Sequence, residues 1–148
     1  MIGRLTLILA SASLISRALP AAPYIDPAAK VAPKAYIEDR AWIGPRASIG
    51  NIEIENDTVV MPDAIVEALV EDHCFIGDHA VIRGMIESYA VVGSSAVVAE
   101  DALVESRVVI GPNAVIGKKA LIENDAVVRA GATVPPGTTV PAGAVYPR

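Results

Sequence analysis

Several features that would narrow the function of this chain are scarce or missing. It has one cysteine, Cys74, among 148 residues, which excludes an internal disulfide framework. Lys and Arg number 12 against 17 Asp and Glu, and the formal net charge of −5 leaves no basic stripe to neutralise nucleic-acid phosphates. Histidine occurs twice, at His73 and His79. The composition therefore argues against a disulfide-stapled domain and against a nucleic-acid partner.

The N-terminal segment, residues 1–22, has no acidic residue and carries two arginines around an apolar centre from Leu5 to Ile15. That apolar run is too short to span a bilayer comfortably, so no transmembrane span is predicted. We expect this segment to form a helix that lies against the rest of the chain or caps it. The alternative is a signal peptide or a transit-like presequence, because such leaders combine apolar and basic residues. The expected location is the cytoplasm, unless residues 1–22 are such a leader.

A six-residue repeat organises the second domain, residues 23–148. Isoleucine or valine recurs at every sixth position from Ile25 to Val140, and the residue four places later is nearly always small. Three steps are shorter, and they follow Ile49, Val66 and Ile82. Because side chains alternate along a strand, both positions point to the same side, and each repeat forms one short strand and one corner. Strands this short must coil and stack to bury their apolar side, which predicts an all-β parallel solenoid of about seven coils.

The repeat resembles the left-handed parallel β-helix of the hexapeptide-repeat superfamily, which includes LpxA-like acyltransferases. This resemblance implies three faces and left-handed coiling, neither of which follows from the periodicity alone. With three faces, the three shorter steps fall at the same corner of successive coils. Cys74 occupies one of the small inward positions, which favours a packed thiol over a reactive one.

One face of the predicted solenoid is acidic. A glutamate follows the inward residue of that face in six consecutive coils, and neighbours in this row would lie about 4.8 Å apart. The row, called the acidic ladder below, consists of Glu38, Glu55, Glu71, Glu87, Glu105 and Glu123. We expect solvation and pairing with Arg40, Arg107 or the cations of a neighbouring subunit to offset the repulsion. The functional alternative is a docking strip for cations or for a basic protein partner.

Another face carries an outward apolar row, called the apolar strip below. Its members directly precede the inward residues and are Tyr24, Trp42, Val59, Phe75, Val91, Val109 and Val127. An exposed strip of this length is typical of an interface, and we predict that it packs between the subunits of a homotrimer. Residues 1–22 are the competing cover. A second apolar row on the remaining face consists of Ile65, Val81, Val97 and Val115.

Three stretches narrow the resemblance to the γ-class carbonic anhydrases and their relatives. They are PYIDPAAKVAPKAYI, IGDHAVIRGMIESYAVVGSSAVV and AVVRAGATVPPGTTVPAGAVY, of which the last is shared with hexapeptide acyltransferases. In the anhydrase family three histidines hold a zinc ion between subunits, and the matching positions here are Glu67, Asp78 and Arg83. None is histidine. Glu67 and Arg83 would face each other on adjacent coils, where a salt bridge is expected.

Other parts of the anhydrase site also differ from the family pattern. The Arg-Gly-Asp motif is replaced by Gly50, Asn51 and Ile52, and Met61 stands where the family has an active-site glutamine. A hydratase needs zinc to lower the pKa of a bound water, and the arginine at the third ligand position would repel a metal dication. We therefore predict no bound metal and no cofactor.

We interpret the chain as a non-catalytic trimeric scaffold or assembly subunit, similar to γ-carbonic anhydrase-like proteins that have lost zinc. Two enzymatic alternatives stay open. One is a hexapeptide-repeat acyltransferase, in which His79 would be the general base by elimination; the other is a divergent metal-dependent γ-type carbonic anhydrase. His73 and His79 fall on neighbouring corners, about 20 Å apart along the strand path, which is too far to share a metal within one chain.

Overall fold

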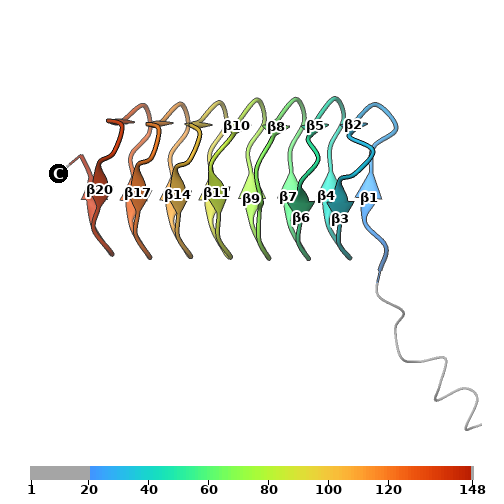
Figure 1. Cartoon of the computed structure of the whole chain (residues 1–148), viewed down its shortest axis with the longest axis horizontal. Helices are drawn as coiled ribbons and strands as arrows, with labels where there is room; N and C mark the ends of the chain where they lie inside the picture. The colour runs from blue at the N-terminus through green and yellow to red at the C-terminus, as the bar shows by residue number, and fades with distance from the viewer. Residues whose placement is uncertain (1–20, 148) are drawn as a thin grey trace, which may run out of the picture.

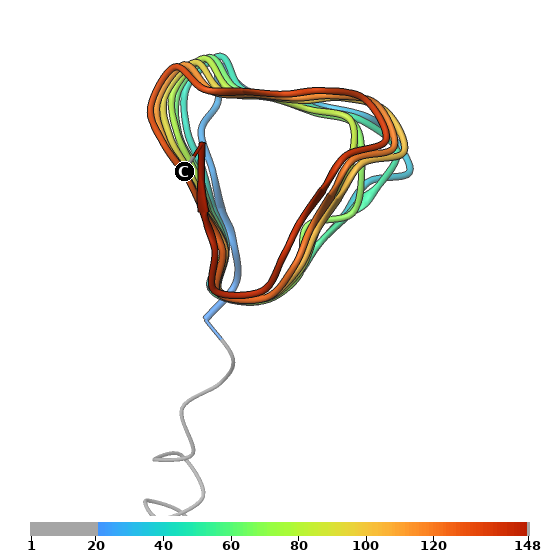
Figure 2. The ribbon, with the colours of Figure 1, turned by 90° about the vertical axis from the view of Figure 1, so that its left-hand side faces the viewer.

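Each strand of this protein is a pair of residues, one pointing outward and one inward. The computed structural model describes residues 21–147, which form an all-β parallel solenoid of about seven turns without a helix (Figure 1). Viewed along its axis, the chain traces a triangle (Figure 2). The predicted fold class is thereby confirmed. The helix or leader expected at the N-terminus lies outside the described residues, and within them no helix could cross a membrane.

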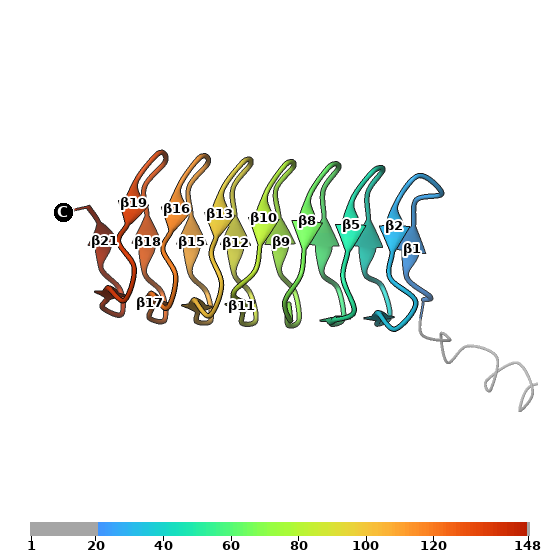
Figure 3. The same cartoon turned by 45° about the horizontal axis from the view of Figure 1, so that its top comes forward.

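Two of the three faces, A and B, are continuous parallel sheets (Figure 3). Face A contains β1 (Tyr24–Ile25), β4 (Trp42–Ile43), β7 (Val59–Val60), β9 (Phe75–Ile76), β12 (Val91–Val92), β15 (Val109–Ile110), β18 (Val127–Val128) and β21 (Val145–Tyr146). Face B contains β2 (Lys30–Val31), β5 (Ser48–Ile49), β8 (Ile65–Val66), β10 (Val81–Ile82), β13 (Val97–Val98), β16 (Val115–Ile116) and β19 (Thr133–Val134).

Face C consists of two sheets joined by single bridges. Its strands are β3 (Tyr36–Ile37), β6 (Glu53–Ile54), β11 (Met85–Ile86), β14 (Leu103–Val104), β17 (Leu121–Ile122) and β20 (Thr139–Val140). Val70 lies between the two sheets and forms a parallel bridge with Ile54 on one side and Ile86 on the other. The acidic ladder therefore follows one continuous face.

The strand register confirms that the shorter steps align. On face B, Ile49 pairs with Val66, and Val66 pairs with Ile82. Because these three residues stack directly, each shorter step removes residues from the same corner, between face B and face C. The inward positions read from the sequence therefore predict the strand register correctly.

The core is a column of Ile and Val on each face, with small residues between them. Ile43, Ile76 and Ile116 are completely buried, as are most of the alanines that lie four positions after an inward residue. The buried polar side chain is Thr58, whose hydroxyl donates to the Glu71 carbonyl at 2.7 Å and accepts from the Cys74 amide at 3.2 Å. The buried hydroxyl therefore both donates and accepts a hydrogen bond, as buried polar groups generally do.

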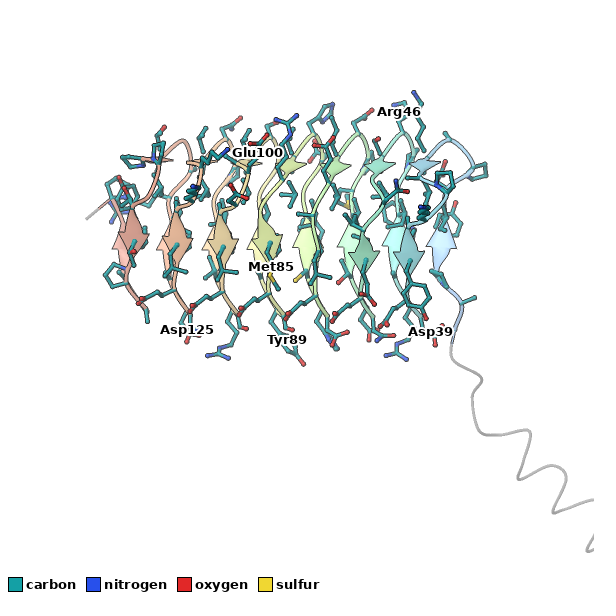
Figure 4. All side chains as sticks on the ribbon, viewed as in Figure 1. Asp39, Arg46, Met85, Tyr89, Glu100 and Asp125 are labelled. Carbon is teal, nitrogen blue, oxygen red and sulfur yellow. The ribbon has the colours of Figure 1, made fainter. Side chains whose placement is uncertain are left out.

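The corners repeat one backbone conformation. Among residues 21–147, thirteen non-glycine residues adopt positive φ values, between 57° and 63°, and both histidines are among them. The amide of such a residue donates to the coil before it, as His73 N does to the Asn56 carbonyl at 2.9 Å. The corner side chains therefore stand in columns along the edges of the solenoid, where Tyr89 and Asp125 share one edge and Arg46 lies on another (Figure 4).

The last coil ends in prolines on all three faces. In the coil before it, the amides of Gly117, Glu123 and Arg129 donate to the last coil at 2.8–2.9 Å. The equivalent positions of the last coil are Pro135, Pro141 and Pro147. Proline has no N–H to donate, so a further strand at this end would lack one hydrogen bond on each face.

Candidate functional site

His79 occupies the corner between β9 and β10 and lies within a group of polar side chains. Its Nδ1 is 3.1 Å from Asp78 Oδ2, and Asp78 Oδ1 accepts a hydrogen bond from the Ser94 hydroxyl. These two hydrogen bonds hold the pKa of Asp78 below its ordinary value. The imidazole itself is 62% exposed. The arrangement is a solvent-facing histidine oriented by a carboxylate, which is the geometry that a general base requires.

The other ring nitrogen of His79 faces a second carboxylate. Nε2 is 3.7 Å from Asp63 Oδ2, which is too long for a hydrogen bond. The Arg46 guanidinium donates to both oxygens of Asp63, at 2.7 and 2.6 Å, and thereby lowers the pKa of that carboxyl. Within residues 21–147, Nε2 therefore faces the Asp63 carboxylate without a hydrogen bond to it.

His73 lies at the other end of β9, at the corner between face C and face A. Its ring stacks on Tyr89 with the centroids 4.7 Å apart, and its Nε2 is 3.6 Å from Asp57 Oδ2. Asp57 is in turn held by Arg40, whose Nε donates to it at 2.7 Å. The stacking on Tyr89 distinguishes this histidine from His79, whose Nδ1 contacts Asp78.

The three positions that match zinc ligands in the anhydrase family do not converge. Arg83 Nε donates to Glu67 Oε2 at 2.9 Å, which is the salt bridge expected between adjacent coils of face B. Asp78 lies at a different corner and is bound to Ser94 and His79. Within residues 21–147 no three His, Cys, Asp or Glu side chains are grouped so that they could hold a metal ion.

Most glutamates of the acidic ladder are held by hydrogen bonds from neutral groups, and not by the two arginines that we expected to pair with them. Its members are half-buried, and Arg40 and Arg107 bind Asp57 and Asp125 instead of the ladder. Five carboxylates accept hydrogen bonds from the corner one coil later, where the donors are Asn56 for Glu38, Ser88 for Glu71, Ser106 for Glu87, Asn124 for Glu105 and the Ala142 amide for Glu123. The predicted pairing with the two arginines is wrong, because the arginines stand in the adjacent corner column.

The apolar strip is continuous and extends one residue further than predicted, to Val145. Phe75, Val91 and Val109 are 38–40% exposed, and Tyr24 stacks on Trp42 with centroids 6.0 Å apart. The glycines beside the strip allow the coils to approach, since a Cβ at Gly77 would lie 2.5 Å from the Ser94 amide nitrogen. The strip as a subunit interface remains a prediction.

Cys74 is packed inside the solenoid, as expected for a small inward position. It is 2% exposed, and its thiol donates to the Glu87 carbonyl at 3.0 Å. Burial raises the pKa of the thiol to about 11. A thiol with that pKa is almost fully protonated at neutral pH and is a poor nucleophile.

Sequence reasoning selects His79 by elimination, but it misses the groups around it. Ser94 and Asp63 come from the neighbouring coils, 15 or 16 residues away in the chain. The signal that could locate them is the corner position itself, since every coil presents a residue at the same place. Tyr89, which stacks on His73, could be found by the same count.

Comparisons with known proteins find the hexapeptide repeat in part of the chain and the same fold in solved structures. A family model described as the hexapeptide repeat of succinyl-transferase matches residues 102–136. No curated protein matches the chain. A solved Bacillus cereus protein assigned as an acetyltransferase is 25% identical, with 79% of this chain and 74% of that chain covered and a TM-score of 0.61.

Two further solved structures share the fold at lower identity. A hexapeptide transferase family protein from Anaplasma phagocytophilum is 19% identical, with 83% of this chain and 68% of that chain covered and a TM-score of 0.52. The GDP-perosamine N-acetyl transferase of Caulobacter crescentus, solved with CoA and GDP-perosamine, is 19% identical with a TM-score of 0.53; the alignment covers 92% of this chain and 60% of the enzyme. Together with the repeat, these likenesses support the left-handed parallel β-helix.

Proposed function

We propose that this hexapeptide-repeat β-helix is an acyltransferase in which His79 acts as the general base. The observation that carries the proposal is the chain of contacts from Ser94 through Asp78 to His79 Nδ1. It singles out one of the two histidines, since the ring of His73 is stacked on Tyr89. The likeness to proteins described as acetyltransferases supports the same reaction class.

The geometry suits proton removal from an acyl acceptor. Asp78 accepts from Nδ1–H, so the lone pair of the neutral imidazole is on Nε2, which has no hydrogen-bond partner among the described residues. As an acceptor hydroxyl or amine attacks the acyl carbonyl, Nε2 takes its proton, and the Asp78 carboxylate stabilises the imidazolium that forms. When the C–S bond of the thioester donor breaks, the imidazolium returns the proton to the leaving thiolate, which departs as the free thiol. The low pKa of Asp78 keeps that carboxylate ionised throughout.

The acyl donor we propose is a thioester of CoA, because one of the structural relatives was solved with CoA bound. His79 stands at an exposed corner, so residues 21–147 of a single chain do not enclose it. We propose that a homotrimer supplies the second wall, with face A and its apolar strip in the subunit contact. In that case water is excluded from His79 only in the assembled homotrimer.

The second candidate is the non-catalytic scaffold related to the γ-carbonic anhydrases. The specific observation in its favour is the Arg83–Glu67 ion pair, which occupies two of the three positions that match zinc ligands. An ion pair of this kind stabilises those positions without a metal. In this case the acidic ladder would be the surface for a protein partner, and His79 would be an ordinary corner residue. A divergent metal-dependent anhydrase is the least supported candidate, because Arg83 would have to leave its partner and stand beside a cation.

The test is the release of CoA from acetyl-CoA in the presence of a panel of amino sugars, with His79→Asn compared to His73→Asn. We expect His79→Asn to lower kcat by about 10²–10⁴-fold, while His73→Asn keeps it within about threefold. Binding of acetyl-CoA should survive both substitutions. If the natural protein neither binds acetyl-CoA nor releases CoA with any acceptor, the acyltransferase is refuted and the scaffold is favoured.

A further inference from the structure

Glu55 breaks the hydrogen-bonding rule of the acidic ladder. The other five glutamates accept from an Asn or Ser side chain, or from a backbone amide, at the corner one coil later. The corresponding position for Glu55 is Asp72, the residue that directly follows Glu71. A carboxylate therefore stands where the other coils place a donor.

Asp72 is itself not satisfied by its surroundings. Its Oδ1 is buried and has no hydrogen-bond partner among residues 21–147, and within the same residues no hydrogen bond reaches the Glu55 carboxyl. Two ionised carboxylates are acceptors only, so they cannot satisfy each other. One added proton converts either of them into an O–H donor.

The charged groups around Glu55 and Asp72 do not offset the repulsion between their two carboxylates. Glu38 faces Glu55 from the coil before, Glu71 faces it from the coil after, and Glu53 lies on its own strand. Arg40 stands in the adjacent corner column and feels the charge of Asp72, but its guanidinium is bound to both oxygens of Asp57. His73 adjoins Asp72 in the chain, yet its Nε2 lies 3.6 Å from Asp57.

We propose that Glu55 and Asp72 share one proton at mildly acidic pH, and that the protonated carboxyl replaces the Asn or Ser donor of the other coils. The Glu55–Asp72 pair then makes the stability of face C depend on pH. Burial raises the pKa of Glu55 above its ordinary value, and the carboxylates of Asp72 and Glu71 add to the rise.

The stability that this pair contributes should fall as the pH rises. A carboxyl whose pKa is raised on folding binds its proton more tightly in the folded state than in the unfolded chain. The stabilisation is complete below the ordinary glutamate pKa and is lost as the pH rises through the raised pKa. Above that point the pair carries two charges, and the corner between face C and face A is weakened by their repulsion.

The deciding experiment is a carboxyl-carbon NMR titration of Glu55 in the natural protein and in Asp72→Asn. The introduced amide can donate to Glu55 as Asn56 and Asn124 do in their coils. We expect the pKa of Glu55 to be elevated in the natural protein and to be lower in Asp72→Asn, where the Asp72 charge is replaced by a donor while burial and the other carboxylates remain. Titration of Glu55 at the same pH in both proteins would overturn the proposal.

Thermal unfolding supplies a matched second test. Asp72→Asn should raise Tm by about 2–4 °C at pH 8 and by much less at pH 4. The mirror variant Asn124→Asp places an acid opposite Glu105 and should lower Tm, again more at pH 8 than at pH 4. Equal Tm changes at the two pH values would contradict proton sharing. If Asn124→Asp fails to fold, the NMR titration of the natural protein and Asp72→Asn still decides.

Discussion

Replacing Phe75 with glutamate should break the proposed homotrimer without unfolding the chain. Phe75 lies in the middle of face A, between Val59 and Val91 of the neighbouring strands. Its side chain points outward and is 38% exposed in the single chain. The substitution therefore leaves the core untouched, and its effect falls on whatever packs against the strip.

The expected size of the effect is a large loss of association. Full burial of a phenylalanine contributes about 1.5–3 kcal/mol, and the part still exposed here leaves about 1 kcal/mol for an interface. A carboxylate desolvated at the same place costs several kcal/mol more. Together these amount to about 3–5 kcal/mol per subunit, which weakens each contact by at least about a hundredfold.

Sedimentation velocity over a range of protein concentrations measures this directly, and circular dichroism checks that the solenoid is intact. The matched control is Val97→Glu, which places the same charge on face B between Val81 and Val115. We expect Phe75→Glu to sediment as a monomer and Val97→Glu to remain a trimer. A trimeric Phe75→Glu protein, or dissociation caused by Val97→Glu alone, would refute the assignment of face A.

Three further outcomes follow from the fold. Thr58→Val keeps the shape of the buried side chain but leaves the Cys74 amide without its acceptor, so urea unfolding should show a loss of about 1–3 kcal/mol; an unchanged midpoint would contradict that bond's role. Cys74, with its pKa raised to about 11 by burial, should resist iodoacetamide at pH 8 in the folded protein and react once guanidinium has unfolded it; rapid labelling of the folded protein would show that the thiol is accessible. Replacing Pro135, Pro141 and Pro147 together by Gly, Glu and Arg, the residues one coil earlier, provides the three amide donors that the preceding coil has. Light scattering should then detect more association than in the natural protein; equal scattering from both proteins would mean that the prolines do not limit strand addition after this coil.

The fold can be predicted from the repeat because the inward-pointing residues can be identified in the sequence. Ile49, Val66 and Ile82 can be aligned from the sequence alone, since a solenoid with three faces has a single way to stack them, and the strand pairing agrees. Alternation then places Phe75 outward and Cys74 inward. The stacking of the three residues also needs the three faces that the resemblance implies, whereas the inward and outward positions need only the direction of side chains along a strand.

Contacts between corners are harder to predict, because they depend on how far a side chain leans from one coil to the next. Glu38 and Asn56 are 18 residues apart and meet through a left-handed corner conformation that the repeat does not reveal. The same geometry sends Arg40 to Asp57 and away from the acidic ladder. The γ-carbonic anhydrase subtype rests on a few stretches of sequence, and the structural relatives described above are transferases.

The most direct test of the acyltransferase proposal is native mass spectrometry of the protein, purified without chelator and mixed with acetyl-CoA. A trimer that binds one acetyl-CoA per subunit and carries no zinc is the predicted result. A trimer that binds no acetyl-CoA, or one that carries zinc, would contradict a CoA-dependent site built around His79.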